Sequence, residues 1–93
     1  MKSAKAKGAK NERRSIALLE GAGYRCTRSG GSLGVWDVIG IGHLGIVLCQ
    51  VKTRDWPGTE EMVALRAFPC PSNCTKLLHR WRDGQPVPDI RTI

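Results

Sequence analysis

The sequence predicts an α/β domain in which a small mixed sheet of about five strands packs against flanking helices. Two stretches space their apolar residues as helices do, and several short runs between Gly and Pro residues are rich in β-branched and aromatic residues. The chain has 93 residues, enough for one core and too few for two. We therefore expect a basic flexible arm over residues 1–8 and a single domain over residues 9–93.

The first predicted helix covers residues 9–20, where Ile16 and Leu19 lie on one stripe and the following glycines stop the helix. The second covers residues 59–68. A threonine can cap its start, two glutamates in its first turn suit the positive end of the helix dipole, and Pro69 ends it.

Five runs are predicted as strands, and together with the helices they give the order α-β-β-β-α-β-β. The run over residues 46–52 is almost continuously apolar, which indicates a central strand. Pro86 and Pro88 place the last strand at an edge of the sheet. The other predicted strands cover residues 24–28, 35–41, 76–82 and 87–93.

Four polar residues fall on faces that the pattern would otherwise bury. Glu12 lies four residues before Ile16 on the helical stripe, and Asp37 alternates with apolar neighbours in its strand. Gln50 and Lys52 share one face of the central strand. Buried ionisable groups are costly unless they are paired or bound to a metal, so these residues predict one shared site.

This combination suits hydrolysis of a phosphodiester. We expect Asp37 to be the central ligand of Mg²⁺, or of Mn²⁺, beside the Gln50 amide oxygen and the Val51 carbonyl. Lys52 can orient or deprotonate the attacking water or stabilise the transition state. Glu12 can complete a second metal position or bind the metal through water.

The charge distribution favours a polyanionic partner. The net charge is +7, and residues 1–14 carry six basic residues against Glu12 alone. DNA is the expected partner, and a disordered solubilising tail is the alternative. No apolar run approaches the roughly 20 residues of a membrane span, and polar residues occupy the place of a signal sequence, so we expect a cytoplasmic protein without a cleaved leader or a membrane partner.

Several motifs, in order, resemble the archaeal-type Holliday junction resolvases of the PD-(D/E)xK nuclease superfamily. The resemblance is close over residues 7–54. Each motif alone is weak evidence for the family, and their order and spacing together are much more specific. The matching segments are Lys7-Gly8, Glu12-Arg13, Arg25, Arg28-Ser29-Gly30-Gly31-Ser32, Asp37 and Gln50-Val51-Lys52-Thr53.

The resemblance implies a restriction-endonuclease-like core and a metal-dependent endonuclease that resolves branched DNA in recombination or repair. Resolvases of this kind act as homodimers. The family's catalytic positions match Glu12, Asp37, Gln50 and Lys52, together with the loop serine Ser32. The basic and polar positions that match or adjoin the family's DNA contacts are Lys7, Lys10, Arg13, Arg14, Arg25, Arg28 and Ser29.

The chain departs from the family at Gln50, where the resolvases have an acidic metal ligand. The loss of one negative charge leaves an inactive DNA-binding module as an alternative, beside a nuclease of the same core that acts on other structured or single-stranded DNA. Trp36 replaces the proline of the superfamily motif, a position that varies.

Structural roles compete with the catalytic ones. Asp37 can bond the amides of the glycine-rich turn, and Lys52 can lie on the rim with an extended stem. Glu12 can pair with Lys5, Arg13 or another exposed base on its helix. Cys70 and Cys74 can form an adventitious disulfide, and Cys26 and Cys49 suit small buried positions. A small zinc protein built on the cysteines is a further alternative, although no C-x-x-C pair is present.

Overall fold

The computed structural model describes residues 4–93, and its elements confirm the predicted order. Two helices and five strands follow one another as α-β-β-β-α-β-β, and the strands form a single mixed sheet. Neither helix in this range is long and apolar enough to cross a membrane. The elements are α1 (Ala4–Gly21), β1 (Arg25–Arg28), β2 (Val38–Ile41), β3 (Ile46–Thr53), α2 (Thr59–Ala67), β4 (Cys74–Trp81) and β5 (Asp89–Thr92).

The strands lie in the order β1-β2-β3-β4-β5, and only the pair β3 and β4 is parallel. β3 is therefore the central strand, as its apolar run predicts. β5 forms an edge beside β4 and begins directly after Pro88, in agreement with the predicted effect of the prolines.

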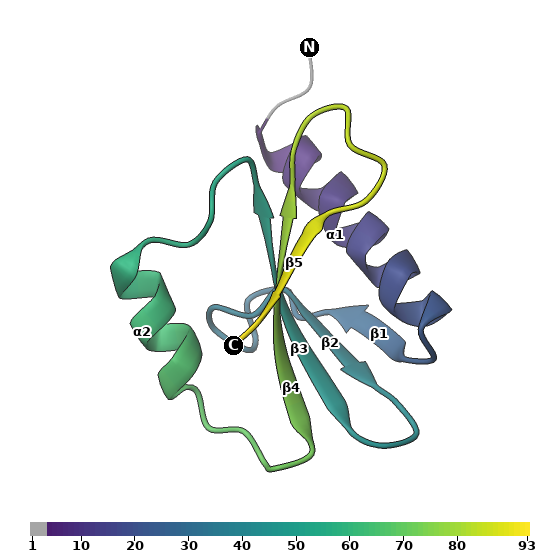
Figure 1. The fold of residues 1–93 in the computed structure, drawn as a ribbon, viewed down its shortest axis with the longest axis vertical. Helices are drawn as coiled ribbons and strands as arrows, with labels where there is room; N and C mark the ends of the chain where they lie inside the picture. The colour runs from purple at the N-terminus through teal and green to yellow at the C-terminus, as the bar shows by residue number, and fades with distance from the viewer. Residues whose placement is uncertain (1–3) are drawn as a thin grey trace.

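The helices cover opposite faces of the sheet, as Figure 1 shows with the sheet seen nearly edge-on. On the α1 side, Leu19 packs against buried side chains of β2 and β3. On the α2 side, Leu65 packs with Trp36, Leu48 and Leu78. Because β3 is covered on both faces, its odd and even side chains are both buried, which explains why its sequence does not alternate.

The first helix begins at Ala4, five residues before the predicted start at residue 9. The added turn is basic and lacks an apolar stripe, so periodicity could not reveal it. A polar contact holds this part of α1 instead: Lys7 forms a 2.9 Å ion pair with Asp83. One turn further on, Asn11 Nδ2 donates to Thr53 Oγ1 at 2.9 Å. Residues 4–8 of the predicted flexible arm are therefore helical, and residues 1–3 lie outside the described residues.

The second strand is shorter than predicted. β2 begins at Val38, so the first three residues of the predicted strand belong to the connection from β1. Trp36 turns into the core, where it is fully buried and meets Phe68 edge to face at a centroid distance of 6.2 Å. The predicted start of this strand, at residue 35, was therefore wrong. Over so short a run, one large buried side chain in a loop gives the same sequence pattern as a strand.

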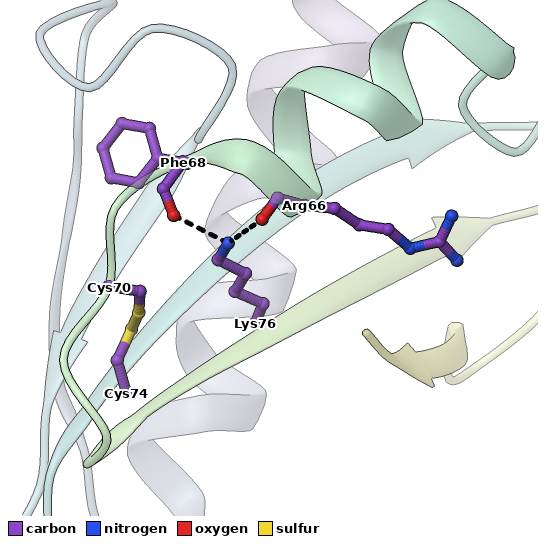
Figure 2. Close-up of a disulfide and its surroundings, with 5 residues drawn as sticks. All are labelled: Arg66, Phe68, Cys70, Cys74 and Lys76. Atoms are coloured by element: carbon purple, nitrogen blue, oxygen red, sulfur yellow. Dashed lines mark hydrogen bonds between the residues drawn. A yellow bond between two sulfur atoms is a disulfide. The ribbon is translucent and has the colours of Figure 1, made fainter.

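A disulfide joins Cys70, in the connection from α2 to β4, to Cys74, the first residue of β4. Figure 2 shows it beside Lys76, whose Nζ donates to the carbonyl oxygens of Arg66 at 2.9 Å and Phe68 at 2.8 Å. The ammonium thus satisfies carbonyls at the C-terminal end of α2, where the helix dipole favours a positive charge. Cys49 is buried as expected, and Cys26 is partly buried.

Candidate active site

Asp37 lies immediately before β2 and is held by the backbone of β3. Its N–H donates to Cys49 O at 3.1 Å, and its Oδ2 accepts a 2.8 Å hydrogen bond from Val51 N. The alternative in which the carboxylate bonds the amides of the glycine-rich turn is therefore wrong. These two bonds place a partly buried carboxylate beside the C-terminal half of the central strand.

Gln50 and Lys52 project from β3 on the side covered by α2, as the period-two pattern predicts. Gln50 is 6% exposed, and its Nε2 donates to Val35 O at 3.3 Å and to Glu61 Oε2 at 3.1 Å. Its Oε1 is buried and has no hydrogen-bond donor among residues 4–93. Lys52 Nζ lies 3.2 Å from Glu61 Oε1.

Glu12 reaches the same region from α1, but it is committed to an ion pair. Its Oε1 accepts from Arg28 Nε at 2.8 Å, and its side chain is 21% exposed. The partner comes from β1 rather than from a neighbouring turn of the helix. Glu12 nevertheless lies close enough to Asp37 to act on its pKa.

Glu61 is the residue of this site that the sequence analysis missed. It lies in the first turn of α2 and contacts both Gln50 and Lys52. Its position in the sequence predicts only a favourable charge at a helix N-terminus. The one signal for it is indirect: a site that lacks a carboxylate at Gln50 calls for one from another element.

The carboxylates influence one another electrostatically. Burial raises the pKa of Asp37, and the negative charges of Glu12 and Glu61 raise it further, while the Val51 N–H and the Lys52 ammonium oppose the shift. For Glu61, burial raises the pKa, but hydrogen bonds and charge from Lys52 and a hydrogen bond from Gln50 outweigh it, so the net shift is downward. The site thus concentrates negative charge around Asp37, which a cation would relieve.

Asp37 and the Gln50 amide oxygen are suitable ligands for a hard divalent cation, but they do not form a complete ligand set. No group of three or more His, Cys, Asp or Glu side chains within residues 4–93 is arranged to hold a metal. A cation at Asp37 would therefore depend on other oxygen atoms, and the unpartnered Gln50 Oε1 is an acceptor of the kind that Mg²⁺ and Mn²⁺ prefer. A zinc protein is disfavoured because the disulfide removes the thiolates of Cys70 and Cys74.

The predicted DNA contacts divide into two groups. Arg13 and Arg25 are exposed and make no side-chain hydrogen bond or ion pair within residues 4–93. Arg14 instead lies over the Trp81 ring, 3.9 Å from its centroid, and donates to Gln85 O at 2.9 Å. It stabilises the contact between α1 and the end of β4 whether or not DNA binds.

The glycine-rich connection carries the two candidate serines. The Ser29 hydroxyl donates to the Trp36 carbonyl, which anchors the loop close to Asp37. Ser32 is exposed, and its hydroxyl makes no hydrogen bond to the other candidate residues in the described chain. The structure therefore does not bring Ser32 into direct contact with Asp37, Gln50 or Lys52.

A basic hollow lies between α1 and the turn after β4. Lys52 and Thr53 pair with Arg80 and Trp81, so the hollow opens at the same end of the parallel strands as Lys52. Its volume is about 120 Å³, and its lining comprises Lys7, Lys10, Asn11, Arg14, Trp81, Arg82, Asp83 and Gly84.

The sheet order and the two flanking helices define an α/β fold, and comparison with solved structures finds a protein of similar fold. The chain is similar to Hjc, a Holliday junction resolvase from the archaeon Archaeoglobus fulgidus, with a TM-score of 0.70 and 19% sequence identity. The match covers 94% of this chain and 71% of the resolvase. No protein-family model and no curated protein sequence matches the chain. The comparison confirms the fold that the sequence motifs predict.

Proposed function

We propose that the chain is a divalent-metal-dependent endonuclease that cleaves branched DNA, with four-way junctions as its substrate. The observation that carries the proposal is Asp37 fixed on the Val51 amide, with Gln50 and Lys52 projecting beside it from the same strand. The similarity of the fold to that of a Holliday junction resolvase supports this proposal.

In this proposal Asp37, the Gln50 amide oxygen and the Val51 carbonyl hold the metal, with Glu12 in a second or water-mediated position. The metal would lower the pKa of a bound water and stabilise charge on the phosphate. Lys52 would orient that water or donate to the phosphate oxygens as their charge develops. Ser32 would contact the DNA strand near the cleaved bond.

The DNA would contact exposed basic residues on α1 and β1 together with the basic hollow. Arg13 and Arg25 are exposed and available to phosphates, and the hollow lined by Lys7 and Lys10 adds positive charge beside Lys52. A two-fold homodimer would present two such sites to the symmetric strands of a junction. Recombination or repair is the process that such an activity would serve.

The test is cleavage of a labelled four-way junction beside its linear duplex, in Mg²⁺, in Mn²⁺ and in chelator. We expect paired nicks in the junction only, and only with metal. Asp37→Asn should reduce the rate by about 100-fold or more, because it removes the central charge of the metal site. Asp55→Asn is the matched control because Asp55 is exposed beyond the end of β3, and it should cleave normally.

Gln50 favours one second candidate, a DNA-binding module without catalysis. In that case the unaltered chain and Asp37→Asn would bind the junction with equal affinity. Neither chain would cut it in Mg²⁺ or in Mn²⁺. Efficient cutting of flapped, nicked or single-stranded DNA, with the junction left intact, would indicate a nuclease of this fold with a different substrate.

A further inference from the structure

Glu61 and Gln50 form a contact that joins α2 to the central strand. The Glu61 carboxylate accepts from Gln50 Nε2 at 3.1 Å, and both of its oxygens lie within 3.4 Å of Lys52 Nζ. One carboxylate on a helix therefore touches the two strand residues that the proposed chemistry needs.

We propose that Glu61 is a positioning residue that compensates for the amide at Gln50: from α2 it supplies the missing negative charge and orients the Gln50 amide and the Lys52 ammonium. This inference rests on the proposed function, because the oriented groups act on a metal and a phosphate. Glu61 itself acts through its two neighbours.

The orientation of the Gln50 amide is the first support. Its Nε2 faces two acceptors, Val35 O and Glu61 Oε2. Turning the amide over would bring Oε1 against both of these oxygens, where it could only repel them. Glu61 thus fixes Oε1 as the atom without a partner in the described part of the chain, although the side chain is 94% buried. A buried acceptor left without a donor calls for a ligand, and a cation satisfies it.

The charge around Asp37 is the second support. A strand glutamate at position 50 would add a negative charge beside Asp37, and Gln50 adds none. Glu61 contacts Gln50 and Lys52, the two strand residues that project beside Asp37, so its charge contributes negative potential to the place where the cation would bind. A carboxylate contributed by α2 can therefore serve electrostatically where the strand carries an amide.

The contact with Lys52 is the third support. The ammonium is held between the two Glu61 oxygens at 3.2 and 3.4 Å. Lysine has a long, flexible side chain, and a fixed anion restricts the positions that its Nζ can occupy. Glu61 therefore places the Lys52 ammonium on the α2 side of β3, next to Gln50.

The test compares Mn²⁺ affinity, measured by electron paramagnetic resonance without DNA, for four chains. These are the unaltered protein, Glu61→Gln, Glu60→Gln and the exchange Gln50→Glu with Glu61→Gln. Loss of a residue that orients metal ligands typically weakens metal binding by about 10–100-fold, which is the effect expected for Glu61→Gln. Glu60 is the matched control, because it is exposed in the same helical turn and makes neither contact.

The exchange distinguishes a charge role from a purely structural one. It returns the carboxylate to the strand and leaves an amide on α2, so Mn²⁺ affinity should recover to near that of the unaltered chain. The side-chain amide resonances of residue 50 provide a second readout: in Glu61→Gln they should shift relative to Glu60→Gln, because the acceptor of Nε2 loses its charge. Thermal scans confirm that each chain is folded.

The outcomes separate the two proposals. Equal Mn²⁺ affinity for Glu61→Gln and Glu60→Gln would overturn the role of Glu61 while leaving the nuclease proposal in place. If Gln50→Glu with Glu61→Gln binds Mn²⁺ as weakly as Glu61→Gln alone, Glu61 does not compensate for the missing charge at Gln50. If the unaltered chain binds no Mn²⁺ and leaves the junction uncut, the proposed function fails, and the inference that rests on it fails as well.

Discussion

Buried polar residues show at the scale of single side chains how this fold is held together. Ser15 is fully buried in α1, and its Oγ lies 2.9 Å from His79 Nδ1 and 2.8 Å from Trp81 Nε1. One hydroxyl thus satisfies two ring nitrogens of β4. Such pairing is required because a buried polar group without a partner costs about 1–3 kcal/mol.

His79 makes the stability of the protein dependent on pH. Burial lowers the pKa of His79 to about 4 from a usual value of 6.5, so the unfolded chain binds a proton more readily than the native one. Its contribution is fully present above pH 6.5 and is lost as the pH falls from 6.5 towards 4. We expect this group to reduce the free energy of unfolding by up to about 3 kcal/mol over that window.

Urea unfolding between pH 4 and pH 8 measures this effect. His79→Gln should flatten the pH profile relative to the unaltered protein, and His43→Gln should not, because His43 is exposed in the turn between β2 and β3. Parallel profiles for His79→Gln and the unaltered chain would show that acid sensitivity has another source.

At the scale of elements, a glycine determines how closely the turn before β3 approaches the start of β4. A Cβ at Gly45 would lie 2.0 Å from Asn73 O, a backbone atom that cannot move aside as a side chain can. The same carbonyl accepts the 3.0 Å hydrogen bond from Ile46 N at the start of β3. The parallel pair of strands therefore requires glycine here.

Gly45→Ala should destabilise the protein by about 3 kcal/mol, at the upper end of the usual cost of overpacking, because the backbone must shift. Gly58→Ala is the control, since a Cβ there meets no atom within 4 Å. Chemical denaturation of the two variants checks the difference. A Gly45→Ala chain as stable as Gly58→Ala would contradict the close approach.

At the scale of the whole molecule, charge controls the proposed interaction with DNA. The net charge is +7, but Lys7, Arg14 and Arg28 each have a partner within the protein. Arg13 and Arg25 are exposed cations without one in the described chain. Among the predicted DNA contacts, these two are consequently the residues whose charge is most available to phosphates.

Junction affinity measured over a series of salt concentrations tests this division. Arg13→Gln and Arg25→Gln should each lower the slope of log K against log salt concentration by about 1, the effect of one lost phosphate contact. Arg66→Gln removes the same charge from the C-terminal turn of α2 and should leave the slope unchanged. Equal slopes for all three variants would indicate that net charge alone governs binding.

The amino-acid pattern alone determined the order of the elements, the central place of β3 and the edge position of β5. It also selected Asp37, Gln50 and Lys52, which the structure places together. These features follow from local periodicity. Side chains return to the same face of a helix or a strand every few residues, so the spacing of apolar residues shows which face is buried.

The tertiary structure decided what each polar group touches. It extended α1 to Ala4 through polar contacts, assigned Arg28 to Glu12, and brought Glu61 from α2 to Gln50 and Lys52. Periodicity carries no information about these partners. They are separated by loops in the sequence, and only the packing of α1 and α2 on opposite faces of one sheet determines which charges meet.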